Sequence, residues 1–343
     1  MPRYRRVQNI THNIGPSGSL EVRVTSADIR LTAVPGDGAD LQATFEVNAK
    51  DEIEADAIFE ASKMTVDASS GRLHVADDSG RVRGIGGAIN LVLGGHHVEL
   101  KDIEGSAPPA VRLGIQAVSG DVQATGFLGR QRYESVSGDL RLTDGGGELA
   151  IQSVSGDVSL RAVEPATMNV NTVSGDLSAE APSFARLDLN AVSGDILVDG
   201  SLEDGVTHAV ETVSGDLRLA SDSGMTITVR GLASDVHSSV PHRLEGSADR
   251  RRLIVGDGTA TLTFSSMSGD MSLTRSRQAA SQTAAASTTA RASTTAATAS
   301  ASASASASAT SGGRAADPQT EVLAALERGE IDVDEAMRRL GGE

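Results

Sequence analysis

The tetrapeptide Val-Ser-Gly-Asp recurs six times, and this recurrence constrains the fold more than any other feature. The six copies end at Asp121, Asp139, Asp157, Asp176, Asp195 and Asp216, so successive aspartates are 18, 18, 19, 19 and 21 residues apart. Weaker copies end at Asp102, Asp235 and Asp270. A fixed period near twenty is typical of coils that stack and bury an apolar face against their neighbours. The spacing predicts an all-β fold, a β-solenoid or parallel β-helix-like stack of about 19 residues per coil.

Apolar residues hold constant positions when each repeat is numbered from its aspartate. Positions −8 and −6 are apolar in most repeats, as in Leu149 and Ile151, and this alternation predicts a strand. Positions +1 and +3 are apolar as well, as in Leu140 and Leu142. The valine at −3 has the opposite parity to −6. The pattern therefore predicts that the strand changes its inward face before the valine, and that Ser-Gly-Asp forms a corner.

The residues of the corner fit a tight turn. Glycine adopts positive φ angles without strain, and an aspartate can accept backbone N–H groups of its own turn. The glycines predicted to form these structural turns are Gly120, Gly138, Gly156, Gly175, Gly194 and Gly215. A second, polar corner follows each repeat and absorbs the differences in length. An antiparallel meander or sandwich is the alternative fold, but one constant and one variable corner per repeat favour one coil per repeat.

Composition excludes several classes of protein. Cysteine is absent, which excludes disulfides and thiol chemistry, and the net charge of −16 argues against nucleic-acid binding. No apolar stretch is long enough to span a membrane. The basic N-terminal residues are not followed by the apolar core of a signal peptide, so we expect a cytoplasmic location, with an envelope-associated or surface location as the alternative.

The sequence divides into five segments by pattern and composition. We predict a disordered N-terminal arm (1–16), degenerate β-repeats (17–97), regular solenoid repeats (98–274), a disordered Ala/Ser/Thr linker (275–316) and a helical hairpin (317–343). Within the second segment, Ser26-Ala27-Asp28 resembles a degenerate Ser-Gly-Asp corner. The hairpin has too few apolar residues for independent stability, so it should bind a partner, a second copy or the solenoid. Its predicted partner-binding residues are Leu323, Leu326, Ile331, Met337 and Leu340.

These motifs resemble a known family. The tandem Val-Ser-Gly-Asp units are similar to the bacterial β-strand-repeat family of putative adhesins, a domain of unknown function, over roughly residues 17–274. The tail from Leu326 to Leu340 resembles the short C-terminal helical (SHOCT-like) domain, which accompanies that repeat in some envelope-stress proteins. The resemblance implies an adhesin-like or envelope-associated scaffold.

The aspartates are the main candidate site. In register, Asp121, Asp139, Asp157, Asp176, Asp195 and Asp216 would form a column with like charges about 5 Å apart. Calcium could compensate these charges, but each coil brings only one corner carboxylate, and the structural turn is the favoured interpretation. We therefore predict no metal and no cofactor. His208 occupies an inward position, and the adjacent His96 and His97 should point to opposite faces of a strand.

An enzyme is the less favoured functional class. Sugar subsites usually rest on aromatic side chains, and the repeats contain only Phe127, Tyr133, Phe184 and Phe264, two of which, Tyr133 and Phe264, lie at inward positions. The even spacing of the carboxylates follows from the repeat, not from an acid/base pair. We predict a non-catalytic scaffold that binds a protein or an envelope surface and self-associates through its hairpin. The alternative is a cytoplasmic envelope-stress component that acts through the hairpin.

Overall fold

The computed structural model describes residues 2–77, 98–233, 235–247 and 250–276. The hairpin, His96, His97 and all but the first two residues of the predicted linker lie outside this part of the chain. The elements in chain order are β1 (Arg3–Asn13), β2 (Ser19–Ser26), β3 (Asp28–Ala33), β4 (Gly38–Asn48), α1 (Glu52–Ser62), β5 (Thr65–Ser69), β6 (Arg72–Ala76), β7 (Val98–Ala107), β8 (Arg112–Ser119), β9 (Val122–Thr125), β10 (Arg130–Ser137), β11 (Leu140–Ser155), β12 (Val158–Ser174), β13 (Leu177–Ser193), β14 (Ile196–Leu202), β15 (Thr207–Ser214), β16 (Leu217–Ala220), β17 (Met225–Ala233), β18 (Val236–Ser238), β19 (His242–Ser247), β20 (Arg250–Val255), β21 (Ala260–Ser268) and β22 (Met271–Thr274).

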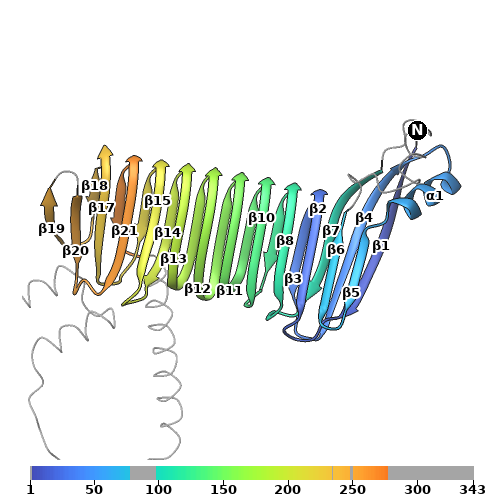
Figure 1. Ribbon diagram of the computed structural model, residues 1–343, viewed down its shortest axis with the longest axis horizontal. Coiled ribbons are helices and arrows are strands. Elements are labelled where there is room, and N and C mark those ends of the chain that lie inside the picture. Colours follow the sequence, from blue (N-terminus) through green and yellow to red (C-terminus); the bar gives the residue numbers. More distant parts are fainter. Residues whose placement is uncertain (1, 78–97, 234, 248–249, 277–343) are drawn as a thin grey trace, which may run out of the picture. The chain divides into compact units, whose positions relative to one another are not determined.

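The repeats form a β-solenoid of parallel coils, as predicted (Figure 1). The strand segments that precede each Ser-Gly-Asp corner pair with one another and form one sheet, here called the leading sheet. The segments that follow the corner form a second sheet, here called the trailing sheet. In spatial order the leading sheet contains β5, β6, β2, β8, β10, β11, β12, β13, β15, β21, β17, β20 and β19. The trailing sheet contains β1, β4, β7, β3, β9, β11, β12, β13, β14, β16, β22 and β18. The long strands β11 to β13 pass the second corner and contribute to both sheets.

Spatial order departs from chain order at both ends of the stack. In the coil β2–β3, β2 lies between β6 and β8, and β3 lies between β7 and β9. The coil β21–β22 lies between β15–β16 and β17–β18 (Figure 1). The expectation that consecutive units are neighbours is therefore wrong for the terminal coils. At the C-terminal end the chain adds the antiparallel strands β19 and β20 and then returns to place β21–β22 inside the stack. At the N-terminal end β2–β3 forms first, and β4 to β7 are added on its outer side.

Residues 1–16 do not form the predicted disordered arm. Residues 3–13 form β1, which pairs antiparallel with β4 over its whole length. The following segment contains a helix, α1, that we did not predict. Asp51 caps it by accepting the N–H of Glu54 at 2.8 Å, and the ring of Phe59 packs edge-on against Phe45 with 5.4 Å between centroids. The side of the helix that carries Phe59 thus packs onto β4.

The apolar core follows the repeat positions. Side chains at −8, −6, +1 and +3 are buried throughout the regular coils, and Phe127, Tyr133, Phe184 and Phe264 are all at most 1% exposed. His208 is buried at its inward position, and its ring Nε2 contacts the carbonyl oxygen of Glu203 at 3.1 Å. Register shifts in β11, β12 and β13 occur at the second corner, between Thr143 and Gly147, Arg161 and Thr167, and Glu180 and Ser183. The second corner absorbs length variation, as predicted.

Candidate functional site at the corner

The corner glycines stack one upon another. Gly156 has φ of +112°, and a Cβ added there would lie 2.3 Å from the carbonyl oxygen of Gly138 in the preceding coil. Gly138 meets Gly120, and Gly175 meets Gly156, at 2.2 Å in the same way. Glycine is therefore required twice at each corner, for its backbone conformation and for the close approach of the next coil.

The serines of the motif bind the neighbouring coil. The hydroxyl of Ser155 donates to the carbonyl oxygen of Val136 at 3.2 Å, and the hydroxyl of Ser137 donates to that of Val118 at 3.3 Å. Ser193 makes the same bond to Val173 at 3.3 Å. These bonds satisfy a carbonyl that faces away from the sheet ladder at the turn.

The aspartates form a continuous hydrogen-bonded column, here called the aspartate ladder. Each Oδ1 accepts the backbone N–H of the aspartate in the next coil, at 2.8–3.1 Å, in the spatial order Asp28, Asp121, Asp139, Asp157, Asp176, Asp195, Asp216, Asp270 and Asp235. The aspartates form the predicted column. Asp28 belongs to it, so Ser26-Ala27-Asp28 is a corner of the same kind, as predicted. The expected acceptor geometry is wrong, because the N–H belongs to the neighbouring coil, not to the aspartate's own turn.

The ladder gives a prediction that separates its hydrogen bond from its charge. In Asp157→Ala the N–H of Asp176 loses its acceptor, which should lower the free energy of unfolding by about 1–2 kcal/mol. Asp157→Asn keeps a carbonyl oxygen at the same place and removes the charge, so it should be nearly neutral. Urea unfolding of both variants measures the difference; equal stabilities would contradict a structural role for Oδ1.

Four aspartates of the ladder, Asp139, Asp157, Asp176 and Asp195, line a shallow groove of about 350 Å³. Three arginines form ion pairs with aspartates of the ladder outside its middle. Arg218 reaches Asp195 at 2.9 Å and Asp216 at 4.0 Å, Arg30 lies 3.6 Å from Asp28, and Arg251 lies 3.8 Å from Asp235. Within the described residues, Asp121, Asp139, Asp157 and Asp176 form no ion pair. Arg141 also lines this groove but forms no ion pair with them, so in this part of the chain the middle of the ladder presents a row of carboxylates without ion-pair partners.

The motif valines lie on the outer surface. Val118, Val136, Val154, Val173, Val192 and Val213, here called the valine stripe, are 45–49% exposed. The inward residue is the one before them at −4, for example Ser153, which is 5% exposed. The parity change predicted before the valine is wrong, because the strand keeps its alternation through −4 and changes its inward face only at Ser-Gly-Asp.

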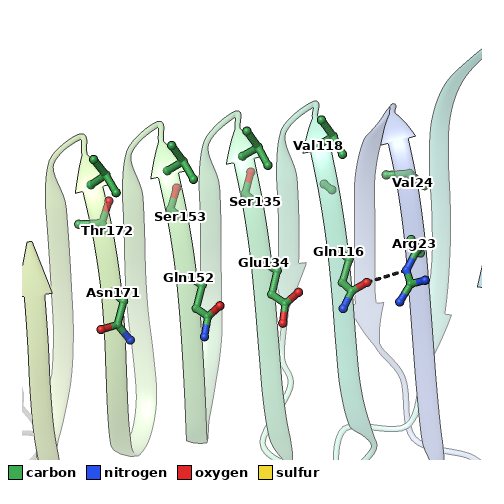
Figure 2. A pocket seen from close by; sticks show the side chains of 14 residues that line it. Arg23, Val24, Gln116, Val118, Glu134, Ser135, Gln152, Ser153, Asn171 and Thr172 are labelled. Atoms are coloured by element: carbon green, nitrogen blue, oxygen red, sulfur yellow. Dashed lines mark hydrogen bonds between the residues drawn. The ribbon is translucent and has the colours of Figure 1, made fainter. Parts of the chain in front are cut away.

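A polar row runs beside the valine stripe at position −5. It consists of Gln116, Glu134, Gln152, Asn171, Asn190 and Glu211. Figure 2 shows four of its members, Gln116 to Asn171, side by side on neighbouring strands, with Arg23 donating to Gln116 at 2.6 Å. Stripe and row together line two successive grooves, of about 540 Å³ and about 480 Å³, along the leading sheet. The exposed valines thus belong to one long surface.

No group of three or more His, Cys, Asp or Glu side chains is arranged to hold a metal ion within the described residues. The ladder explains this, because adjacent carboxylates face in one direction along a column and do not converge on a point.

Comparison with known proteins places the chain in a family. Residues 16–274, well over half of its length, match the family model described as Toastrack DUF4097. The chain belongs to the Toastrack family. No curated protein matches it at a significant level.

Three of the solved structures that are similar to this Toastrack chain are bacterial proteins. One is a putative cell adhesion protein from Clostridium sporogenes, with 9% identity, a TM-score of 0.24, and coverage of 79% of this chain and 100% of the other. A putative adhesin from Bacteroides fragilis has 13% identity, a TM-score of 0.39 and coverage of 78% and 97%. A putative lipid binding protein from Parabacteroides distasonis has 9% identity, a TM-score of 0.38 and the same coverage.

The Toastrack coils carry surface features that we did not predict. The exposed valine stripe and the polar row could have been found by extending strict alternation from −6 through −4 instead of placing the change before −3. Arg218, which approaches two successive aspartates of the ladder, is two residues after Asp216. Arg141 has the same position in its own repeat, two residues after Asp139. None of the described helices is long and apolar enough to cross a membrane.

Proposed function

We propose that this Toastrack protein is a non-catalytic, adhesin-like scaffold that binds an extended, basic partner of the cell envelope along its aspartate ladder. The observation that carries the proposal is the middle of the ladder, whose carboxylates lack ion-pair partners within the described residues. There, Asp139, Asp157 and Asp176 line one groove with carboxylates in register.

The protein itself supports the chemistry of such a partner. Arg218 crosses the groove and approaches two successive rungs, so a guanidinium fits between neighbouring carboxylates. Adjacent strands lie about 4.8 Å apart, so a chain with cationic groups along its length would meet several carboxylates at once. Each exposed ion pair contributes little by itself, and the affinity would come from the number of pairs.

The test uses isosteric neutral side chains. The triple variant Asp139→Asn, Asp157→Asn, Asp176→Asn retains the ladder oxygens, so its melting temperature should equal or exceed that of the wild type. Its binding to an oligo-arginine peptide, measured by calorimetry at low salt, should fall at least about tenfold, because three charges facing the groove are lost. Recovery of envelope components by a tagged chain should fall in parallel.

A matched control removes the same charge elsewhere. Asp37→Asn, Glu164→Gln and Glu203→Gln alter three exposed acids away from the groove. This variant should bind the peptide within about twofold of the wild type, since long-range attraction alone is weakly affected at surface sites. Equal losses in both triple variants would show that only net charge matters and would contradict the proposed site.

A further inference from the structure

We propose that the valine stripe is the interface of a homodimer in which two solenoids pack leading sheet against leading sheet with their axes antiparallel. The stripe and the polar row face solvent on this sheet, and the apolar side chains are ordered in a straight column. A contiguous apolar surface of this length on a soluble protein marks an interaction site.

The surface is large enough for a stable dimer. Six coils at a strand spacing of about 4.8 Å extend for roughly 30 Å, and the strand from −9 to −3 is roughly 20 Å long. The projected area of this face, about 600 Å², is close to the approximately 800 Å² of accessible surface that each partner buries in specific interfaces. The projected area does not count the additional surface of the protruding side chains. Pairing is unbroken along this part of the sheet, since the register shifts lie at the second corner.

The charges favour a second copy as the occupant. The chain carries a net charge of −16, yet the polar row contains four neutral amides, which donate and accept hydrogen bonds equally well. A two-fold axis parallel to the strands overlays stripe on stripe and row on row while it reverses the order of the coils. The third valine, Val154, then faces the fourth, Val173, of the partner subunit.

This register places each glutamate of the row opposite an amide. Glu134 faces the partner's Asn190, and Gln116 faces the partner's Glu211. In the column at −7, Arg132 faces the partner's Asp188. Only at the rim do like charges meet, where Arg130 faces the partner's Arg186, and Arg130 already holds Glu148 at 2.7 Å.

Neighbouring registers are less favourable. A shift of one coil toward β21 places Glu134 opposite the partner's Glu211, which opposes like charges within the interface. A shift of one coil toward β2 sets Val213 against the partner's Thr25, so one valine of each chain loses its apolar neighbour. The ion pair that this shift allows between Glu211 and the partner's Arg23 contributes little at an exposed edge. The register that covers all six valines is therefore the one that we assign.

The first test measures the mass of the full-length chain in solution by light scattering and sedimentation. The wild type should have the mass of two chains. Val154→Lys alters a half-exposed side chain, so it should keep the wild-type far-UV circular dichroism spectrum and have the mass of one chain. Val163→Lys is the control, because Val163 is 56% exposed and outside the stripe, and it should remain dimeric. A monomeric wild type, or a dimeric Val154→Lys variant, would overturn the proposal.

The second test fixes the register. Since the chain has no cysteine, Val118→Cys and Val213→Cys each introduce a single thiol. Packed sheets lie about 10 Å apart, so a short bifunctional maleimide is the suitable probe. A mixture of the two variants should give a covalent heterodimer. Val118→Cys alone should give none, because the two copies of its thiol would be about 24 Å apart. Self-linking of Val118→Cys would overturn the antiparallel arrangement.

Discussion

Replacement of Gly156 by alanine should lower the free energy of unfolding by at least about 3 kcal/mol, because it combines backbone strain with a clash. The φ angle of +112° is one that residues with a Cβ rarely adopt, and the new methyl group would lie 2.3 Å from the carbonyl oxygen of Gly138. Neither problem can be relieved locally, since the same contact repeats in the coils on both sides. Urea unfolding followed by far-UV circular dichroism measures the loss.

Gly205→Ala is the matched control for this prediction. Gly205 also has a positive φ, +73°, but a Cβ there would meet nothing within 4 Å. The control should therefore cost about 1 kcal/mol, the strain of a left-handed conformation alone. If both variants lost the same stability, the stacking of corner glycines would not be the cause.

Removal of β21 and β22 should detach the end of the solenoid that lies beyond them. A chain that ends at residue 258 lacks the buried side chains of Leu262, Phe264, Met271 and Leu273, worth on the order of 10 kcal/mol in apolar burial. It also lacks Asp270, which links Asp216 to Asp235 in the ladder. Because β17 and β18 pair with β21 and β22 in the parallel stack, β17–β20 should lose hydrogen-exchange protection while β8–β13 keep theirs.

A chain that ends at residue 276 serves as the control and should keep β17–β20 protected. Protection of β17–β20 in the shorter chain would mean that β17–β18 can close directly onto β15–β16. That result would contradict the interpretation that the inserted coil holds the end in place.

The repeat itself was predictable because its residues act locally. Glycine and aspartate at a fixed period specify a corner whatever lies around it, and the alternation at −8 and −6 specifies a strand. The donor to each aspartate was mistaken, because an N–H group of the same turn and one of the next coil cannot be told apart in the sequence. The change of inward face was placed before the valine at −3 instead of at Ser-Gly-Asp, because the alternation of apolar residues does not reveal where a strand bends.

The order of the terminal coils could not be predicted from the sequence. Every corner offers an aspartate whose Oδ1 can accept the N–H of the next one, so the sequence does not show that Asp270 lies between Asp216 and Asp235. The choice depends on the hairpin β19–β20, which extends the sheet and then sends the chain back. The role of α1 was missed although Asp51 and Glu54 have the spacing of a helix-capping pair.

The out-of-order terminal coils separate the molecule into fixed caps and a modular interior. Coils between β8 and β16 meet equivalent neighbours on both sides, whereas the caps hold antiparallel strands that the interior lacks. Duplication or loss of one interior unit of 18 or 19 residues would thus change the span by one strand spacing, about 4.8 Å, and leave both caps intact. The length of the solenoid can therefore change in evolution by whole coils while the residues of the two ends stay the same.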